Sequence, residues 1–471
     1  MTRSTAVFIA MVVCAAGCLT AASASAAAEG EPIRLHPDNP HYFLWRGKPT
    51  VLVTSGEHYG AVLNLDFDYV PYLEELERHG LNLTRTFSGT YREVPGSFKI
   101  TGNPLAPKPH RFACPWARTK TKGYYDGGGK FDLSKYDPAY FARLKNFLAE
   151  ASKRGVVVEL VLFCPMYNDE LWKACPMNAR NNVNGVGKVG TKQPLTLENG
   201  GLLKYQLAFV RKIVTECNAF DNLYWEICNE PYFGGVTRAW QQRIAEEIVA
   251  TEKGLPRKHL IARNIANGSK RVDDPMPEVR ILNFHYCSPP KAVAMNRHLG
   301  RPIGNDETGF KGSEDVPYRP DGWDFLLAGG TVYSNLDYSF TPDAEDGSAE
   351  PKAPGGGGES LRRALGALKR FMDGLDVVRM EPGTDWVTGG VPKKATVHGL
   401  AQAGRQYALF LRGGRRAGLV LDLPKGTYTA EWVDSRTGEV AKRERFEHGG
   451  GKRTAASPDY DGEIALRVLA R

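Results

Sequence analysis

Two glutamates in this chain each follow a run of residues typical of a buried strand. Glu230 lies near the end of the stretch 224–231 (YWEICNEP), where aromatic and β-branched residues give way to an amide and a carboxylate. Glu307 ends a second such run, within the stretch 302–309 (PIGNDETG). Two carboxylates that converge can cleave a glycosidic bond, because one protonates the leaving oxygen while the other attacks the anomeric carbon or orients water. Their separation would decide the stereochemistry, about 5 Å for retention and wider for inversion.

The segments around these glutamates alternate strand-like apolar runs with amphipathic helical runs. Eight such units predict a parallel sheet closed into a (β/α)8 TIM barrel with insertions, an α/β fold. An open doubly wound sheet is the structural alternative, but no GxGxxG opens a helix in this chain. The expected strands are 49–55, 81–87, 156–163, 222–229, 259–265, 280–287, 302–307 and 331–338, and the expected helices are 67–79, 137–154, 202–217, 239–253, 290–299, 323–328 and 361–375.

In such a barrel, active sites lie at the carboxyl ends of the strands. Glu230 would end the fourth strand and Glu307 the seventh, and these strands face one another across a small barrel. Both side chains can therefore reach one cleft from opposite walls. Two long connections, 88–135 and 164–201, follow strands at the same end, and long loops without secondary structure are usually functional. The alternative is a surface excursion with its own small packing.

Other carboxylates near these strand ends have structural interpretations. Glu226 lies four residues before the first glutamate of the pair, so strand alternation places it on the same face but deeper in the barrel. A buried carboxylate needs a partner, and Arg263 on the fifth strand is a candidate. Glu159 on the third strand has a similar interpretation. Asp306 immediately precedes the second glutamate, so it should point the opposite way.

Further polar and aromatic residues occur where a substrate would bind. Arg85, near the end of the second strand, is a candidate cation for holding Glu307 ionised. Glu57 and His58 follow the first strand and can either bind a substrate hydroxyl or stabilise a turn. Aromatic side chains of the long loops can stack on a sugar ring, with packing inside the loop as the alternative. These rings are Trp116, Tyr167 and Trp172.

The Asn229-Glu230-Pro231 motif, together with a glutamate ending the seventh strand, resembles the clan A glycoside hydrolases, which include the family-5 cellulases and mannanases. The resemblance spans 33–375 through short motifs. It implies that Glu230 is the general acid/base and Glu307 the nucleophile. It also implies that Asn229 binds the sugar 2-hydroxyl, and that hydrolysis retains configuration through a covalent glycosyl-enzyme intermediate.

The same resemblance assigns further positions. Arg85, in the stretch NLTR, matches the second-strand arginine of the clan. His285-Tyr286 matches the sixth-strand pair that lines the subsite at the scissile bond. One position departs from the clan, where a tryptophan usually ends the eighth strand beneath the sugar. This chain has tyrosines and an asparagine there, of which Tyr333 is our candidate for binding substrate.

The pattern changes after Leu375. Short alternating runs separated by turn residues, without helical spacing, predict a small antiparallel β-sandwich domain over 380–471. This part resembles the β domain that follows apiosidase-like barrels in bacterial proteins, a family sometimes labelled collagen-binding. Packing against the barrel and binding of a separate ligand are its two interpretations. The runs are 406–411, 417–423, 428–434 and 463–468.

The first residues are interpreted as a secretory signal peptide over 1–28. Arg3 gives a positive start, the apolar run that follows is short for a bilayer, and small residues at 24–28 form cleavage sites. A lipoprotein is the competing interpretation, because 16–18 (AGC) resembles a lipobox with Cys18 as the lipidated residue. No later segment is apolar enough to cross a membrane, so we expect a secreted or periplasmic protein.

Composition bounds the partners and cofactors. The net charge of +8 is spread along the chain without a long basic run, so no nucleic-acid partner is expected. The histidines include no HExxH and no cysteine spacing resembles a zinc motif, so we expect neither metal nor cofactor.

Export permits disulfides, and one pair among Cys114, Cys164 and Cys175 can be bridged. The cysteines on helices and strands fit buried thiols instead. These are Cys217, Cys228 and Cys287.

Together these features predict a secreted, metal-independent, retaining glycoside hydrolase that acts on a poly- or oligosaccharide. The sequence leaves open the sugar, the linkage, exo or endo action and the oligomeric state. The first alternative is a glycan-binding barrel protein that has lost catalysis. The second is a metal-dependent barrel hydrolase, against which the lack of clustered strand-end histidines counts.

Overall fold

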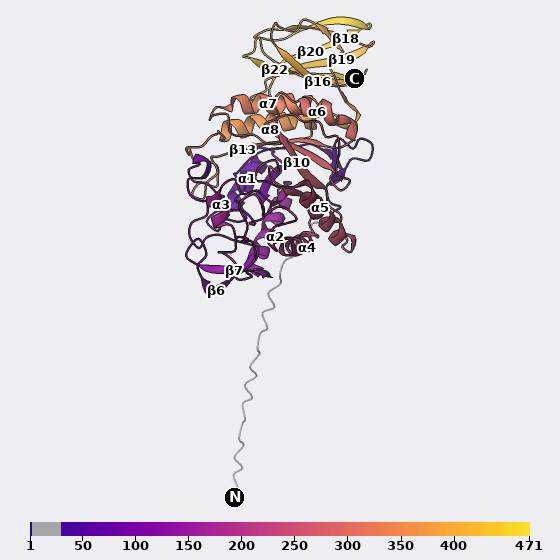
Figure 1. Ribbon diagram of the computed structural model, residues 1–471. Helices are drawn as coiled ribbons and strands as arrows, with labels where there is room; N and C mark the ends of the chain where they lie inside the picture. Colours follow the sequence, from indigo (N-terminus) through magenta and orange to yellow (C-terminus); the bar gives the residue numbers. More distant parts are fainter. Residues whose placement is uncertain (2–29) are drawn as a thin grey trace.

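The computed structural model of the protein describes Met1 and residues 30–471. The predicted signal peptide and Cys18 therefore lie outside the described residues. Figure 1 shows a large body of strands and helices, with a smaller all-β body stacked on helices α7 and α8 at the C-terminal end of the chain. Across the described part, every helix is too short or too polar to cross a membrane.

Eight parallel strands form the central sheet, in the hydrogen-bonded order β4-β13-β12-β11-β10-β9-β8-β5. Each strand lies beside the next barrel strand in the sequence, with helices outside, so the predicted (β/α)8 barrel is confirmed. Nearly all strand residues are buried, since helices cover one face and side chains fill the interior. The strands are β4 (Leu52–Gly56), β5 (Leu83–Phe87), β8 (Val157–Phe163), β9 (Leu223–Cys228), β10 (Ile261–Asn267), β11 (Ile281–His285), β12 (Ile303–Glu307) and β13 (Val332–Leu336).

Asn82 joins the two ends of this order and closes the barrel. Its backbone N–H donates to the carbonyl of Val53 (3.1 Å), and its Oδ1 accepts from the N–H of Val53 (3.0 Å). Its Nδ2 donates to the carbonyl of Val51 (2.9 Å). One side-chain amide thus satisfies backbone groups that a ladder between β4 and β5 would otherwise pair.

The helices follow the barrel strands, and several begin at side-chain caps. Asp68, Asp137 and Thr237 each accept a hydrogen bond from a backbone N–H in the next helix. Helix α7 is longer than predicted, because Pro320 lies inside it and interrupts the helical pattern. The helices are α1 (Tyr69–Arg78), α2 (Pro138–Lys153), α3 (Asp169–Ala174), α4 (Leu203–Cys217), α5 (Arg238–Lys253), α6 (Lys291–Asn296), α7 (Asp315–Leu327) and α8 (Glu359–Asp373), with the short 3-10 helices η1 (Ser97–Lys99), η2 (Arg297–Leu299) and η3 (Val377–Arg379).

A small antiparallel sheet packs against the N-terminal ends of the barrel strands. Its Phe43 stacks on Tyr224 of β9, with ring centroids 6.5 Å apart. Both rings belong to an apolar cluster that includes early residues of most barrel strands. This end of the barrel is therefore filled, and the opposite end is left for a site. The sheet consists of β1 (Arg34–Leu35), β2 (Phe43–Trp45) and β3 (Lys48–Thr50).

The long connection 88–135 contains a hairpin, so the prediction of a structureless loop there was wrong. Strands β6 (Trp116–Lys122) and β7 (Gly129–Tyr136) pair antiparallel, with irregular register. Polar residues, lysine above all, outnumber apolar ones in these strands, and this composition concealed the alternation. The second long connection, 164–201, carries only the short helix α3.

The chain from β14 onward forms two antiparallel sheets, which confirms the predicted β-sandwich. Strands β14, β15, β16, β20 and β21 were missed in the sequence, because the first two are very short and β20 is rich in charged residues, while β16 and β21 show no strong apolar alternation. One sheet has the order β14 (Glu381–Pro382), β16 (Thr396–Gln402), β17 (Gln406–Arg412), β22 (Glu463–Ala470), β19 (Gly426–Val433), β20 (Val440–His448), and the other β15 (Val387–Gly389), β18 (Gly418–Leu423), β21 (Gly451–Ala456).

The sandwich packs on helix α7 of the barrel (Figure 1). Trp323 stacks on Phe410, with ring centroids 5.5 Å apart and an interplanar angle of 20°. Arg412 Nη1 lies 3.0 Å from carboxylate oxygens of both Asp321 and Asp324, which are buried. These contacts support the interpretation in which the sandwich packs against the barrel.

All six cysteines in the described residues are free and buried. The possible bridge among Cys114, Cys164 and Cys175 is therefore absent. Burial raises the pKa of each of these thiols, as is typical of inert structural cysteines.

Candidate active site

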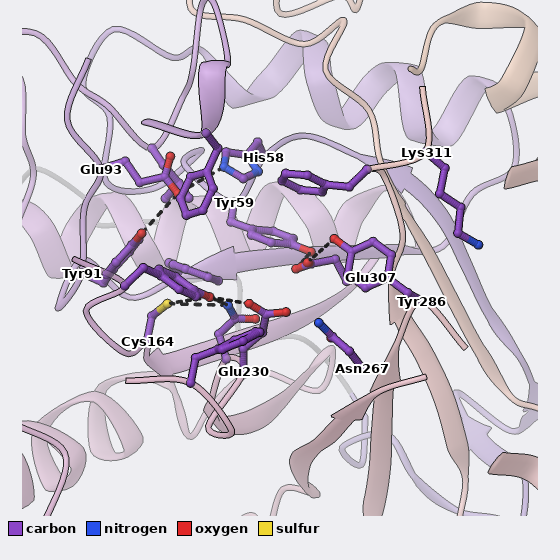
Figure 2. Close-up of a pocket in the computed structure, with 17 residues that line it drawn as sticks. His58, Tyr59, Tyr91, Glu93, Cys164, Glu230, Asn267, Tyr286, Glu307 and Lys311 are labelled. Carbon is purple, nitrogen blue, oxygen red and sulfur yellow. Dashed lines mark hydrogen bonds and ion pairs between the residues drawn. The ribbon is translucent and has the colours of Figure 1, made fainter. Parts of the chain in front are cut away.

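A cavity of about 510 Å³ opens at the carboxyl ends of the barrel strands, with Glu230 and Glu307 in its wall. Figure 2 shows the two carboxylates close together near the middle of the pocket, with Glu93 and Asn267 on opposite sides. Most of the remaining wall is aromatic, as in many small-molecule sites. The rings come from His58, Tyr59, Phe87, Tyr91, Phe98, Tyr167, Phe233, Tyr286 and Phe310.

Glu230 follows β9 in a turn with a backbone φ of +38°, a conformation that non-glycine residues seldom adopt. Three groups hold its carboxylate. The Tyr167 hydroxyl donates to Oε2 (2.7 Å), the Tyr232 hydroxyl donates to Oε1 (3.2 Å), and His285 Nδ1 lies 3.1 Å from Oε1. The strained turn and these contacts together aim the carboxylate into the cavity.

Glu307 is held by hydroxyls and cations. Tyr59 and Tyr286 each donate to a different carboxylate oxygen at 2.8 Å. Arg85 Nη1 and His285 Nδ1 each lie 3.3 Å away. Burial alone would raise the pKa of Glu307, but the charge and hydrogen bond of His285, with Arg85 and Tyr286, hold that pKa well below its ordinary range. Glu307 is therefore ionised in this pocket.

His285 links the two glutamates. Although burial would lower its pKa, the charges of Glu307 and Asp306 raise the His285 pKa well above its ordinary value. Oxygens of Glu230 and Glu307 and a nitrogen of His285 all lie within 4.8 Å of one another, a spacing that could hold a metal ion. Hydrogen bonds and opposite charges hold the three groups together in this structure.

Arg85 lies beneath the pocket floor and does not line the cavity. Its Nη2 donates to Glu226 Oε1 (2.6 Å) and to Asn229 Oδ1 (2.7 Å). The predicted partner of Glu226 was Arg263, which is wrong, because Arg263 instead donates to Gln241 on the outer face of the barrel. Arg85 is thus the shared cation of the barrel interior and the pocket.

Asp306 does not point away from Glu307 as strand alternation predicted. Its Oδ2 lies 3.4 Å from Arg85 Nε, and its Oδ1 lies 3.6 Å from His285 Nε2. The register between β11 and β12 shifts so that Phe284 pairs with Asn305 and His285 pairs with Glu307, which leaves Asp306 as the extra residue of a bulge. A bulge breaks the alternation, so neighbouring acids can both reach the barrel interior.

Asn229 and Tyr286 line the cavity beside the glutamates, and the Asn229 amide nitrogen donates to the Tyr167 hydroxyl (2.9 Å). His58 also lines it, and its Nε2 lies 3.4 Å from Glu93. Glu57 has the turn-stabilising role, because its carboxylate accepts from two backbone N–H groups of the following turn.

Three aromatic candidates lie away from the cavity. Tyr333 is fully buried outside the cavity wall, and its hydroxyl donates to the carbonyl of Tyr318 (2.6 Å), so it packs behind β13 instead of facing substrate. Trp116 packs on Phe209 within the fold, and Trp172 donates to the carbonyl of Val189. Of the predicted loop aromatics, Tyr167 reaches the cavity.

Several pocket residues were not predicted. Tyr59 and Glu93 follow the first and second strands, and position after a strand was the one available signal for both. Asn267 ends the fifth strand and could have been found in the same way. Phe98 and Phe310 lie in loops, and no residue pattern in the sequence predicts that their side chains line the pocket.

These features define a (β/α)8 barrel with a converging pair of glutamates at the mouth. No protein-family model matches the sequence, and the search of curated proteins found no match. A crystal structure from Bacteroides vulgatus ATCC 8482, provisionally assigned as a glycoside hydrolase, has a TM-score of 0.67 at 15% identity and covers 94% of this chain and 83% of that one.

Two further solved structures share the fold. A glycoside hydrolase family 5 structure from Bacteroides vulgatus ATCC 8482 has a TM-score of 0.61 at 12% identity, covering 93% of each chain. Another, described as a glycoside hydrolase, has a TM-score of 0.59 at 12% identity, covering 93% of this chain and 97% of that one. At this identity the likeness establishes a common fold, which agrees with the clan A resemblance. The likeness of the sandwich to domains that follow apiosidase-like barrels stays a prediction.

Proposed function

We propose that the protein is a retaining glycoside hydrolase in which Glu307 is the nucleophile and Glu230 the general acid/base. The observation that carries the proposal is the approach of the two carboxylates, which each place one oxygen within 4.8 Å of the other in one cavity. Retaining enzymes place these groups about 5–5.5 Å apart, and inverting enzymes about 6.5–9.5 Å apart to admit water. The observed approach favours retention.

The surroundings of each glutamate suit its proposed role. Glu307 receives two hydroxyl hydrogen bonds and faces Arg85 and His285, so its carboxylate is ionised and fixed for attack. Glu230 also receives hydroxyl hydrogen bonds and shares His285, which lies 3.1 Å from it. Within the described residues, Arg85 contacts Glu307 but forms neither a hydrogen bond nor an ion pair with Glu230. An acid/base residue must both give and take a proton, and Glu230 is held at the pocket without the arginine that fixes Glu307.

The proposed reaction has two steps. Glu307 attacks the anomeric carbon while the Glu230 carboxylic acid protonates the departing glycosidic oxygen, which forms a glycosyl ester on Glu307 and releases the aglycone alcohol. Water then attacks the same carbon, Glu230 accepts the proton, and Glu307 leaves as a carboxylate. Two displacements at one carbon retain its configuration. Asn229 and Tyr286 are proposed to contact sugar hydroxyls beside the bond.

The substrate and location follow from the sequence. We propose that the protein acts outside the cytoplasm on a carbohydrate, with no nucleic acid as partner. Support comes from the signal-like segment 1–28 and from the fold shared with glycoside hydrolases. The domain limits 33–375 and 380–471 remain proposals, which limited proteolysis between the barrel and the sandwich would test.

Activity against a panel of 4-methylumbelliferyl glycosides and polysaccharides, with the product anomer followed by NMR, tests the proposal. We expect turnover with retention, and a loss of about a thousandfold or more in kcat for Glu230→Gln and for Glu307→Gln. The exposed Glu198→Gln is the matched control and should behave as the parent. Near-parent activity in either pocket variant, with the fold intact by circular dichroism, would defeat the assignment.

The two alternative functions, a glycan-binding barrel and a metal-dependent hydrolase, predict different experimental results. A glycan-binding barrel would show no turnover in the parent and would keep its affinity in both variants. A metal-dependent hydrolase is the second candidate because Glu230, His285 and Glu307 converge within 4.8 Å. Loss of turnover in EDTA that zinc or manganese restores would support it, and turnover unaffected by EDTA would dismiss it.

A further inference from the structure

Three phenylalanine side chains surround the mouth of the pocket and remain partly exposed. The exposed fractions are 37% for Phe98, 44% for Phe233 and 41% for Phe310. All three line the same cavity as the two glutamates. Apolar rings gathered at one opening mark a binding surface, whereas rings scattered singly over a protein need no explanation.

Ring contacts tie two of these phenylalanines to the proposed acid. Phe98 packs edge-on against Tyr167 at 5.4 Å between centroids, and Phe233 lies 6.0 Å from the same ring. The Tyr167 hydroxyl donates to Glu230, and the Phe233 N–H donates to the Glu230 carbonyl (2.9 Å). The departing group is bonded to the oxygen that Glu230 protonates. It must therefore lie beside these rings.

Phe310 extends the apolar wall across the mouth. It follows β12, whereas Phe98 follows β5, and their centroids are 6.3 Å apart. Phe310 also lies 6.2 Å from Tyr286, which binds Glu307. Phe98 and Phe310 are therefore in edge-on contact and form one continuous apolar edge of the mouth.

The backbone that carries Phe98 is itself strained. Phe98 and Lys99 have φ values of +53° and +61°, which non-glycine residues seldom adopt. Hydrogen bonds hold the turn, from the Ser97 N–H to Val94 and from the Lys99 N–H to Gly96. Such strain persists where the surrounding structure fixes it, often at ligand sites. The turn therefore fixes the Phe98 ring at the mouth.

The Tyr232 hydroxyl and the Lys311 ammonium beside the rings already have protein partners. The Tyr232 hydroxyl binds both Asn267 and Glu230, and Lys311 Nζ lies 3.0 Å from Asp321. A sugar at this position could stack one face on the rings, but the rings would accept no strong hydrogen bond from its hydroxyls. Its desolvation would then be poorly offset.

From this arrangement we infer that the leaving group of the preferred substrate is an apolar aglycone, aromatic or alkyl, and not a second sugar. The inference rests on the proposed function and narrows the poly- or oligosaccharide class predicted from the sequence. The sugar that is transferred occupies the side of the pocket where Glu93, Tyr91 and His58 supply polar atoms (Figure 2).

The test compares leaving groups of different apolar bulk, and the ethyl and 2-phenylethyl pair is matched in acidity. The probes are the ethyl and 2-phenylethyl glycosides of whichever sugar the 4-methylumbelliferyl panel identifies, and the disaccharide of that sugar. We expect kcat/KM for the 2-phenylethyl glycoside to exceed both others by about tenfold or more, because it buries a phenyl ring. Phe98→Ala and Phe233→Ala should each reduce this advantage to about threefold or less. Val249→Ala removes an exposed apolar side chain on α5 and should keep it.

A second measurement separates this inference from the chemistry. Saturation-transfer NMR should detect 2-phenylethanol bound to the parent, and the signal should be lost in the Phe98→Ala/Phe233→Ala double variant. Turnover without a 2-phenylethyl advantage, or with a disaccharide preferred, would overturn the inference and leave the proposed function standing. Binding of 2-phenylethanol without turnover of any glycoside would support the apolar subsite and contradict the proposed function. Absence of 2-phenylethanol binding in the parent would overturn the inference.

Discussion

The guanidinium of Arg85, on the second barrel strand, lies 3.3 Å from the carboxylate of Glu307 at the end of the seventh. The same guanidinium stacks over the Tyr59 ring at 4.6 Å, and that tyrosine also binds Glu307. Arg85 in turn is anchored on the buried Glu226. The proposed nucleophile is therefore fixed by groups beneath the pocket that a substrate does not displace.

Replacing His285 with asparagine should move the acidic limb of the pH–activity profile to higher pH. His285 lowers the pKa of Glu307 through its charge and its hydrogen bond, against the effect of burial. Without it the Glu307 pKa rises, so the ionised nucleophile is lost at a higher pH. Profiles of kcat/KM from about pH 3 to about pH 8 measure the shift.

His259→Asn is the matched control for that experiment. His259 is also buried against a glutamate, Glu252, but it lies outside the pocket. Its loss should leave the limb in place. If the acidic limb of the kcat/KM profile stays at the same pH in His285→Asn, this histidine does not control the ionisation of Glu307.

Tyr59→Phe should lower kcat by about tenfold or more, because it removes a hydrogen bond to a charged carboxylate. Tyr42→Phe is the control, since the Tyr42 hydroxyl is buried without a hydrogen-bond partner in the described structure. Its activity should equal that of the parent. Equal activity in both variants would mean that the Tyr59 hydroxyl contributes nothing to the reaction.

Glu93→Gln should raise KM by about tenfold with a smaller effect on kcat. The Glu93 carboxylate lines the pocket and is held by Asn103 (2.5 Å), Tyr91 (3.3 Å) and His58. This rigid acceptor suits a sugar hydroxyl away from the reacting bond. Initial rates over a range of substrate concentration separate the two constants. A fall in kcat alone would contradict a binding role.

Hydrophobic periodicity and strand-end position were enough to predict the barrel, the sandwich and the two glutamates, because burial imposes these patterns directly. They failed where local geometry departs from the pattern. The bulge at Asp306 turns this carboxylate into the barrel interior beside Glu307, and residue type alone does not predict a bulge. The pairing of Glu226 with Arg85 and not Arg263 depends on which face of each strand is inward.

The aromatic wall shows a second limit of sequence reasoning. Phe98 and Phe310 come from loops far apart in the chain, and their meeting depends on loop conformations that no periodicity specifies. Tyr333 illustrates the converse. The clan resemblance suggested substrate contact for it, but Tyr333 is the second residue of β13 and its side chain lies on the outer face, against Tyr318.

Arg412→Ala should lower the thermal midpoint by several degrees, because it leaves Asp321 and Asp324 with fewer partners at the buried interface between sandwich and barrel. Arg416→Ala removes a neighbouring arginine whose ion pair with Asp459 is exposed. That control should stay within about one degree of the parent. Scanning calorimetry compares the three proteins. Equal midpoints would show that the ion pairs do not hold the sandwich in place.

Covalent trapping tests the central claim most directly. The protein is incubated with the 2-deoxy-2-fluoro glycosyl fluoride of its preferred sugar, and peptides are mapped by mass spectrometry. A single glycosyl adduct on Glu307, absent from Glu307→Gln and present in the Glu198→Gln control, is the predicted result. An unlabelled parent that releases product of inverted configuration, or an adduct on another carboxylate, would contradict the account.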